Sequence, residues 1–451
     1  MEKFMSFMEE KFVPVAAKIG SQRHLVAIRD GFIAIMPLII AGSLAVLINN
    51  LSLPGYDHGA FMSRIFGSGW SALGGNVWWG TLAMMALLIS FTVAYNLAKS
   101  YDVNPLTAGA LSVASYMTFI PQADVSVGIP ETVEGIAVPA ELIGKQLGTW
   151  GNISWSFTSY ASLFGAIFVA LVVTEVYVKL VKSGKLEIKM PEGVPPAVSR
   201  TFATLLPVII TIFLVGFAQV WIAKTGTSIS KFLLEVVQAP VASIGNTLGG
   251  AIAVAFFNHI FWFFGLHGSN ILDPVMRSVF MPLATANAEL LQQGLEMQYI
   301  VTKSFFDGFV YMGGSGTTVG LLAAIYVFSK NKAHRSIAKI ATPTSLFNIN
   351  EPVVFGIPIV LNPLFFIPFV FGPVVLTIIS YLATASGIVP MTSVIVPWTT
   401  PPVLGAFLAT NGSVAAALLA LFNLGLTFVM YVPFVLLSNR HSITEIEEEV
   451  A

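Results

Sequence analysis

Long apolar runs separated by short polar loops dominate the hydrophobic pattern of the chain. A helix needs about 20 largely apolar residues to cross a bilayer. Runs of this length predict spans at 31–51, 78–98, 154–180, 202–223, 244–266, 364–385 and 413–437, with weaker candidates at 103–120, 270–290 and 311–329. We therefore expect an all-α polytopic membrane protein with about ten transmembrane helices.

Proline, glycine and polar residues interrupt the apolar runs of the second half, between 297 and 320 and again between 341 and 412. Irregular backbone at membrane depth is stable only where protein buries it or where it lines a water-filled cavity. In transporters, interrupted helices of this kind mark a binding site near the middle of the membrane. The pattern therefore predicts a substrate-binding domain at 224–437 and a scaffold domain at 31–223.

Charged residues gather in a few loops and predict the orientation of the chain. The loop 182–200 and the stretch 330–339 are rich in lysine and arginine, whereas the loop 121–149 is acidic. Basic loops of membrane proteins lie on the cytoplasmic side. With an even number of spans, both the N-terminal segment 1–30 and the C-terminal tail 438–451 are then cytoplasmic.

The composition agrees with a membrane protein, since 55% of the residues are hydrophobic and only 10% are charged. Soluble domains carry roughly 25% charged residues. A net charge of −1 provides no basic field for binding nucleic acid. The absence of cysteine excludes disulfides, thiolate metal sites and cysteine nucleophiles within the chain. The N-terminal segment lacks the apolar core and cleavage site of a signal peptide, so we expect the first span to be retained.

A lone carboxylate, Glu351, stands in the otherwise apolar stretch "TPTSLFNINEPVVFGIP". Pro352 disfavours a helical conformation at the residue before it and suits the first turn of a helix, so Glu351 is expected just ahead of a short helix. It is either a carboxylate that only caps this helix in the headgroup region or a functional group. We favour function, because ionisable residues inside membranes are costly and mark sites. Asn348 and Asn350 beside it add hydrogen-bonding groups suited to a sugar.

Two histidines lie in the stretch "NHIFWFFGLHGSN". Gly265 and Gly268 predict a helix break around His267, and the polar residues that follow favour a lined cavity. His259 would share a face with His267 if the helix were continuous, but a histidine in an apolar run is often only structural. The two histidines form no i,i+4 pair and no HExxH motif, so no metal site is predicted.

Two tryptophans and a glycine-rich run are further candidates. The sequence leaves two roles open for Trp398, in "VPWTTPP": stacking on a sugar ring through its apolar face, or membership of the interfacial aromatic belt. Trp262 lies among aromatic residues that indicate general packing. The run "GGSGTTVG" at 313–320 lacks the lysine of a phosphate loop, so we interpret it as a place of close helix packing.

Four motifs, in this order, carry a resemblance: "FFGLHG" (263–268), "GGSGTT" (313–318), "NINEP" (348–352) and "PWTTPP" (397–402). Together they resemble the membrane IIC component of the lactose/cellobiose/diacetylchitobiose family, part of the phosphoenolpyruvate-dependent sugar phosphotransferase system. The opening "KIGSQRHLVAIRDGFIAIMPLIIAGS" is also similar, and the likeness extends over residues 1–440. The resemblance implies a homodimer whose contact is formed mainly by the first five helices. It also implies two re-entrant hairpins in the second half, where the sugar is held.

The resemblance further implies roles for individual residues. Glu351 and His267 would lie at the sugar hydroxyl that accepts phosphate and would form the catalytic pair. Asn350, Trp398 and Trp262 would line the same pocket. Because a sugar hydroxyl is a weak nucleophile, the carboxylate of Glu351 would accept its proton while His267 orients the hydroxyl.

By the same resemblance, the phosphoryl group comes from a phosphorylated cysteine of a IIB component, ultimately from phosphoenolpyruvate, so no cofactor is expected. Because this chain contains no cysteine, IIB is expected to be a separate cytoplasmic protein. The chain would import a β-linked disaccharide of the cellobiose, diacetylchitobiose or lactose type across the cytoplasmic membrane of a bacterium. It would present a hydroxyl of that sugar, O6, for phosphorylation.

Two other functions stay open on the sequence. An ion-coupled secondary sugar transporter would use Glu351 and His267 as a proton relay. A membrane sensor or scaffold would bind a sugar or a partner without turnover. A phosphorylated product, together with a requirement for IIB, would exclude both.

Overall fold

The structure of the chain is a computed structural model. It describes residues 10, 13–51, 53, 55–120, 153–188, 190–191, 193–226 and 229–450, together with short strands between 126 and 148. The acidic residues of the predicted loop 121–149 lie outside the described residues, as does most of the N-terminal segment before residue 13.

Six helices of the described chain are long and apolar enough to cross a membrane. They are Arg23–Asn50, Ser71–Lys99, Tyr160–Lys182, Phe202–Ala223, Pro363–Ala385 and Val414–Asn439. A seventh span results if the pair Glu235–Gly245 and Leu248–Phe263, which bends by 76°, is counted as one. The predicted helical membrane architecture is therefore confirmed, whereas the ten crossings and the two re-entrant hairpins stay predictions.

The predicted span 270–290 is divided in the structure. A single π-helical turn, Met276–Phe280, separates two shorter helices. Pro274 and Pro282 lie on either side of this turn, and each lacks the N–H group that a continuous helix requires. An apolar run of spanning length is thus not a single straight helix.

Short strands form a small exception to the all-α prediction. They make two antiparallel ribbons, in which β1 Ser126–Gly128 pairs with β4 Gln146–Gly148 and β2 Thr132–Val133 pairs with β3 Ile136–Ala137. Both ribbons belong to the predicted loop 121–149.

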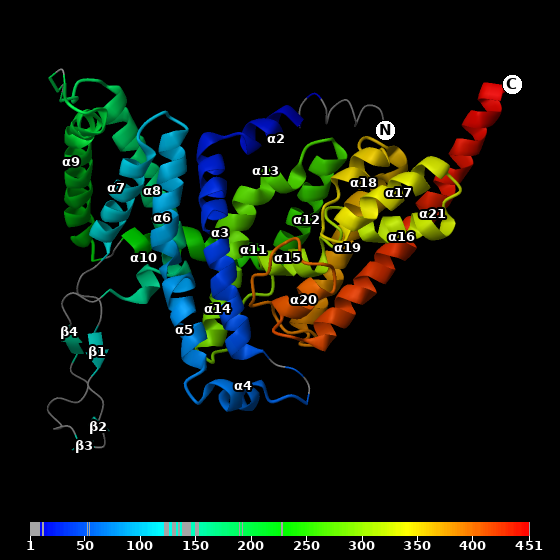
Figure 1. Ribbon diagram of the computed structural model, residues 1–451, viewed down its shortest axis with the longest axis horizontal. Coiled ribbons are helices and arrows are strands. Elements are labelled where there is room, and N and C mark those ends of the chain that lie inside the picture. The colour runs from blue at the N-terminus through cyan, green and yellow to red at the C-terminus, as the bar shows by residue number, and fades with distance from the viewer. Residues whose placement is uncertain are drawn as a thin grey trace. The chain divides into compact units, whose positions relative to one another are not determined.

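Contacts divide the chain into two compact units, the first of which comprises residues 30–35 and 83–239. Its elements are η2 Leu82–Met84 at the boundary, α6 Met85–Lys99, α7 Pro105–Phe119, the four strands, η3 Trp155–Phe157, η4 Tyr160–Ser162, α8 Leu163–Lys182, α9 Pro196–Ala223, α10 Ile229–Leu233 and the π-helical turn η5 Leu234–Gln238. Helix α6 packs against α7 and α8, and α9 packs against the same two helices (Figure 1). This unit is a helical bundle.

The second unit comprises residues 1–29, 36–82 and 240–451, and α3 Arg23–Asn50 contributes to both units. Its other elements are α2 Val13–Gly20, α4 His58–Phe66, α5 Ser71–Gly80, α11 Ala239–Gly245, α12 Leu248–Phe263, α13 Gly268–Val275, η6 Met276–Phe280, α14 Met281–Gln292, α15 Lys303–Phe309, α16 Thr318–Phe328, α17 Lys332–Ser345, α18 Glu351–Gly356, α19 Pro363–Ala385, α20 Leu404–Ala409 and α21 Val414–Val450. The four motifs singled out in the sequence all lie in this unit.

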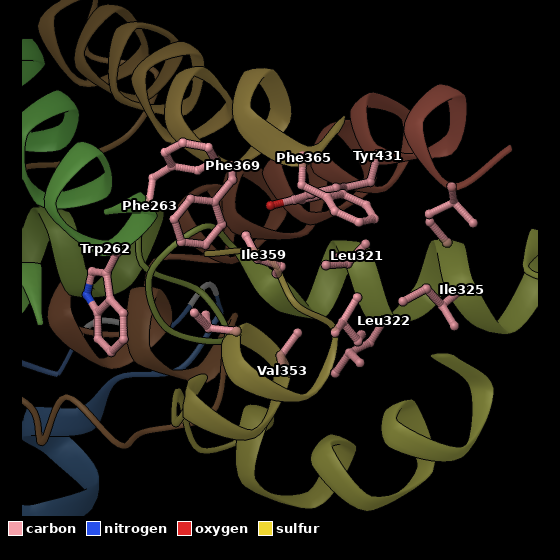
Figure 2. Close-up of a cluster of buried hydrophobic side chains, with 14 of the residues drawn as sticks. Trp262, Phe263, Leu321, Leu322, Ile325, Val353, Ile359, Phe365, Phe369 and Tyr431 are labelled. Atoms are coloured by element: carbon pink, nitrogen blue, oxygen red, sulfur yellow. The ribbon is translucent and has the colours of Figure 1, made fainter. Parts of the chain in front are cut away.

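A core of buried apolar side chains joins the elements that carry three of these motifs, "FFGLHG", "GGSGTT" and "NINEP" (Figure 2). It takes side chains from α12, α16, α18, α19 and α21, including Phe263, Leu322, Val353 and Phe369. Tyr431 lies in the same cluster, and its hydroxyl donates a hydrogen bond to the carbonyl oxygen of Gly316 at 2.7 Å. The short helix α18 is therefore anchored through its apolar residues, which fixes the direction of its first turn.

Candidate functional site

Glu351 and His267 face each other across the second unit. The distance between His267 Nε2 and Glu351 Oε1 is 3.4 Å, and the two side chains are 41% and 42% exposed. Glu351 is the first residue of α18, and His267 immediately precedes α13. The helix α18 begins one residue earlier than predicted from Pro352. Two predicted candidates from distant motifs thus form one pair that a ligand can reach.

The ring of His267 is held in a defined orientation. Its Nδ1 accepts a hydrogen bond from the backbone N–H of Asn270 at 3.2 Å and so caps the start of α13. A neutral ring that accepts at Nδ1 carries its proton on Nε2, the nitrogen that faces Glu351. The ring of Trp262 packs against that of His267, with centroids 4.3 Å apart. The cap and the tryptophan together aim an N–H donor at the carboxylate.

Glu351 is placed to be ionised. The short helix α18 is not one of the membrane-spanning helices. The hydrogen bond from His267 lowers the pKa of the Glu351 carboxyl below its ordinary value, and partial burial opposes this effect. Backbone N–H groups at the start of the helix also favour the charged form. The carboxyl group of Glu351 is therefore a carboxylate at neutral pH, which is the state needed for accepting a proton.

A buried polar network lies next to this pair. Asn258 donates to Ser315 Oγ at 3.0 Å, and Ser269 donates to Asn258 Oδ1 at 3.2 Å. Trp262 Nε1 donates to Ser269 Oγ at 3.3 Å, and Asn350 Nδ2 donates to the carbonyl oxygen of Ser315 at 3.1 Å. The network joins α12, the start of α13, the glycine-rich run and the residue before Glu351.

This network involves residues that the sequence did not single out. The run around Ser315 was interpreted as helix packing alone, whereas its serine is a shared hydrogen-bonding partner. Gly268 permits the start of α13 to approach α12 closely, because a Cβ on it would lie 2.0 Å from the carbonyl oxygen of Asn258. Asn350 is only 4% exposed. Its predicted contact with a sugar stays a prediction, as does that of the buried Trp262.

Asn348 joins three of the four motifs through one side chain. Its Oδ1 accepts from the backbone N–H of Gly313 at 2.7 Å. Its Nδ2 donates to the carbonyl oxygens of Trp398 and Thr400, at 2.6 and 2.8 Å. The residue is 6% exposed and has a φ of +63°, which asparagine tolerates better than most residues. The expectation that Asn348 offers its amide to a sugar is therefore wrong, because backbone groups occupy that amide.

The remaining candidates are Trp398 and His259. Trp398 is 52% exposed, so its ring is available for contact, and both predicted roles stay open. His259 is fully buried, its Nδ1 lies 2.5 Å from the carbonyl oxygen of Ala255, and its ring packs near those of Tyr311 and Phe369. Because α12 ends at Phe263, His259 does not continue the face that bears His267. Among the described residues, no three His, Asp or Glu side chains come together as metal ligands.

Comparisons with known proteins give consistent matches. The family model described as "Phosphotransferase system, EIIC" matches residues 29–373. The lichenan permease IIC component of Bacillus subtilis (strain 168) is 36% identical over 447 residues, covering 99% of this chain and 96% of that protein. The cellobiose-specific EIIC component of Geobacillus stearothermophilus is 36% identical over 449 residues, with the same coverage of 99% and 96%.

A solved structure is similar over nearly the full length of both chains. It is the crystal structure of the transporter ChbC, the IIC component from the N,N'-diacetylchitobiose-specific phosphotransferase system. The two share a TM-score of 0.90 and 36% sequence identity, over 98% of this chain and 99% of that chain.

Proposed function

The chain belongs to the EIIC family of the phosphotransferase system, and from this premise we propose that it imports a β-linked disaccharide and presents its O6 hydroxyl for phosphorylation. Membership of this family makes the chain a membrane sugar permease. The names of the relatives mention lichenan, cellobiose and diacetylchitobiose, and these sugars support a β-linked substrate.

The contact between Glu351 and His267 is the observation that carries the proposal. A carboxylate held ionised can accept the proton of a hydroxyl as that hydroxyl attacks phosphorus. The Nε2–H of His267 is placed to orient the carboxylate or the hydroxyl. Asn350, Trp398 and Trp262 complete the proposed sugar pocket, and the exposed ring of Trp398 suits stacking on a sugar face.

The phosphoryl donor in this proposal is a separate cytoplasmic IIB protein phosphorylated on cysteine, since this chain has no cysteine. The sugar oxygen forms a bond to phosphorus while the bond between phosphorus and the cysteine sulfur breaks. The electron pair of that bond leaves with the sulfur as a thiolate, and the hydroxyl proton passes to Glu351. Phosphoryl transfer otherwise depends on positioning and on stabilisation of charge.

The proposal extends to assembly and orientation. Residues 31–223 would form the contact of a homodimer, and residues 224–437 would hold the sugar between two re-entrant hairpins. Both termini would face the cytoplasm of a bacterium, as the basic loops predict. The phosphorylated product cannot return through a pocket built for the free sugar, so import and modification are coupled.

Reconstitution tests this function directly. In inside-out vesicles containing the chain, we expect labelled cellobiose or diacetylchitobiose to become a sugar phosphate only when phospho-IIB is supplied. Vesicles with IIB that has not been phosphorylated serve as the control. Accumulation of unmodified sugar that follows a proton gradient and needs no IIB would contradict the proposal, and would identify an ion-coupled transporter instead.

A substitution at His267 separates its two interactions. In His267→Asn, the asparagine oxygen still caps α13, but no donor reaches Glu351. We expect the transfer rate to fall by about 10²-fold, with thermal unfolding close to that of the unmodified protein. His267→Ala, which loses the cap as well, should unfold at a lower temperature. An unchanged transfer rate in His267→Asn would show that the Nε2–H contributes nothing to transfer.

A further inference from the structure

The helix α17, Lys332–Ser345, has one face packed on the protein and one face that nothing in the described chain covers. The packed face includes the buried residues Ala338, Ala341 and Ser345. The exposed face runs along the whole helix and into the turn that follows it. We call this surface the α17 face; it consists of Lys332, Arg335, Ser336, Lys339, Ile340, Pro343, Leu346 and Phe347.

The α17 face changes character along its length. Its first part is basic, with Lys332, Arg335 and Lys339, and Lys330 is exposed just before the helix. No ion pair with a carboxylate is found for these four side chains among the residues whose side chains are described. Burial lowers the pKa of His334 on the inner side of the helix, so His334 adds no charge near neutral pH. Within the part of the chain whose side chains are described, no carboxylate neutralises this cationic charge, and the guanidinium of Arg335 also donates a hydrogen bond to the carbonyl oxygen of Ser329 at 3.1 Å.

The second part of the α17 face is apolar and leads to the catalytic pair. Ile340 is 76% exposed, and Leu346 and Phe347 are exposed as well. Helix α17 packs directly against α18, which begins at Glu351 (Figure 1). At this contact Gly356 lies so close to Ile337 that a Cβ on it would be 2.7 Å from a methyl carbon of that side chain. The α17 face and Glu351 thus belong to one packed substructure.

We propose that the α17 face is the docking surface for the phosphoryl-donating IIB protein. The inference rests on the proposed function, because the donor phosphorus must reach a hydroxyl held at Glu351. A protein that delivers it there must cover the surface around α18, and α17 is the element packed against that helix. An acidic region on the donor, beside its phosphorylated cysteine, would complement the basic part, while the transferred group itself reaches Glu351. The apolar part supplies the dehydrated contact on which interfaces depend.

A membrane surface is the other partner that a basic helix with apolar residues can bind. On a helix that lies in a membrane, apolar residues form a stripe along its length, opposite the basic residues. Here the stripe opposite the basic residues is packed on protein, and the exposed apolar residues follow the basic ones along the same side. This arrangement favours a protein partner with an acidic and an apolar region.

The test reverses the charge of the basic part in the full chain, as Lys332→Glu, Arg335→Glu and Lys339→Glu combined. The matched control reverses another basic cluster, as Lys179→Glu, Lys182→Glu and Lys185→Glu, all exposed residues at the end of α8. In liposomes of neutral lipid with saturating disaccharide, we expect the KM for phospho-IIB to rise at least about tenfold at low salt in the first variant. Its kcat and disaccharide Kd should stay unchanged, and the control should match the unmodified protein.

Several outcomes would overturn the inference while leaving the proposed function standing. One is an unchanged KM for phospho-IIB in the first variant while the sugar is still phosphorylated. An equal rise in the control indicates a general effect of net charge, and an effect seen only in liposomes with anionic lipid indicates a membrane contact.

A neutral variant, with Lys332→Gln, Arg335→Gln and Lys339→Gln combined, should show a smaller rise in the KM for phospho-IIB. It replaces the charge-reversed variant in the test if that variant does not fold. If the unmodified chain forms no sugar phosphate with phospho-IIB, the proposed function itself fails.

Discussion

Replacing Glu351 with glutamine should lower kcat for phosphoryl transfer by about 10³-fold while disaccharide binding persists. Glutamine keeps the size of the side chain and an oxygen that can accept from His267 Nε2, which lies 3.4 Å from the carboxylate. It cannot take the proton of the attacking hydroxyl. The measurement is single-turnover formation of sugar phosphate from phospho-IIB, together with equilibrium binding of labelled disaccharide.

Glu296→Gln is a suitable control, since Glu296 is an exposed glutamate outside the four motifs. It should behave as the unmodified protein in both measurements. Rapid phosphorylation by Glu351→Gln would show that another group accepts the proton. Loss of binding together with transfer would instead assign Glu351 to holding the sugar in the ground state.

Local chain breaks were predictable from the sequence. Gly265 and Gly268 predicted the break before His267, and the structure ends α12 at Phe263 and starts α13 at Gly268. Pro352 predicted a short helix near Glu351, which the structure has as α18. These features depend on neighbouring residues alone, because glycine and proline act on the backbone where they stand.

The meeting of the motifs was not predictable from the residues themselves. The partners of Asn348 and Ser315 lie in segments far apart in the sequence, so their hydrogen bonds depend on how irregular loops meet. No periodicity carries that information, since hydrophobic patterns report which face of an element is buried. The division of 270–290 at Met276–Phe280 was missed for a related reason, because its apolar length satisfied the rule for a span despite the prolines.

Substitutions of Asn348 should reveal whether its hydrogen bonds to Gly313, Trp398 and Thr400 hold the sugar pocket in shape. In Asn348→Ala, the N–H of Gly313 and the carbonyls of Trp398 and Thr400 lose their shared partner, and a residue with φ of +63° becomes strained. Each buried group left without a partner costs about 1–3 kcal/mol. We expect thermal unfolding in detergent at a clearly lower temperature and a disaccharide Kd raised at least about tenfold.

Two further substitutions separate the contributions at this position. Asn348→Gly relieves the backbone strain but loses the same hydrogen bonds as Asn348→Ala. The difference in unfolding temperature between the glycine and alanine variants therefore measures the backbone contribution alone. Asn348→Asp keeps an acceptor for Gly313 but places a carboxylate oxygen against the carbonyls of Trp398 and Thr400 in a buried setting. Although aspartate has nearly the shape of asparagine, it should weaken disaccharide binding at least as much as alanine does. A tolerated Asn348→Asp would mean that the donors of Asn348 do not hold the Trp398 segment, and the pocket would then owe its shape to packing alone.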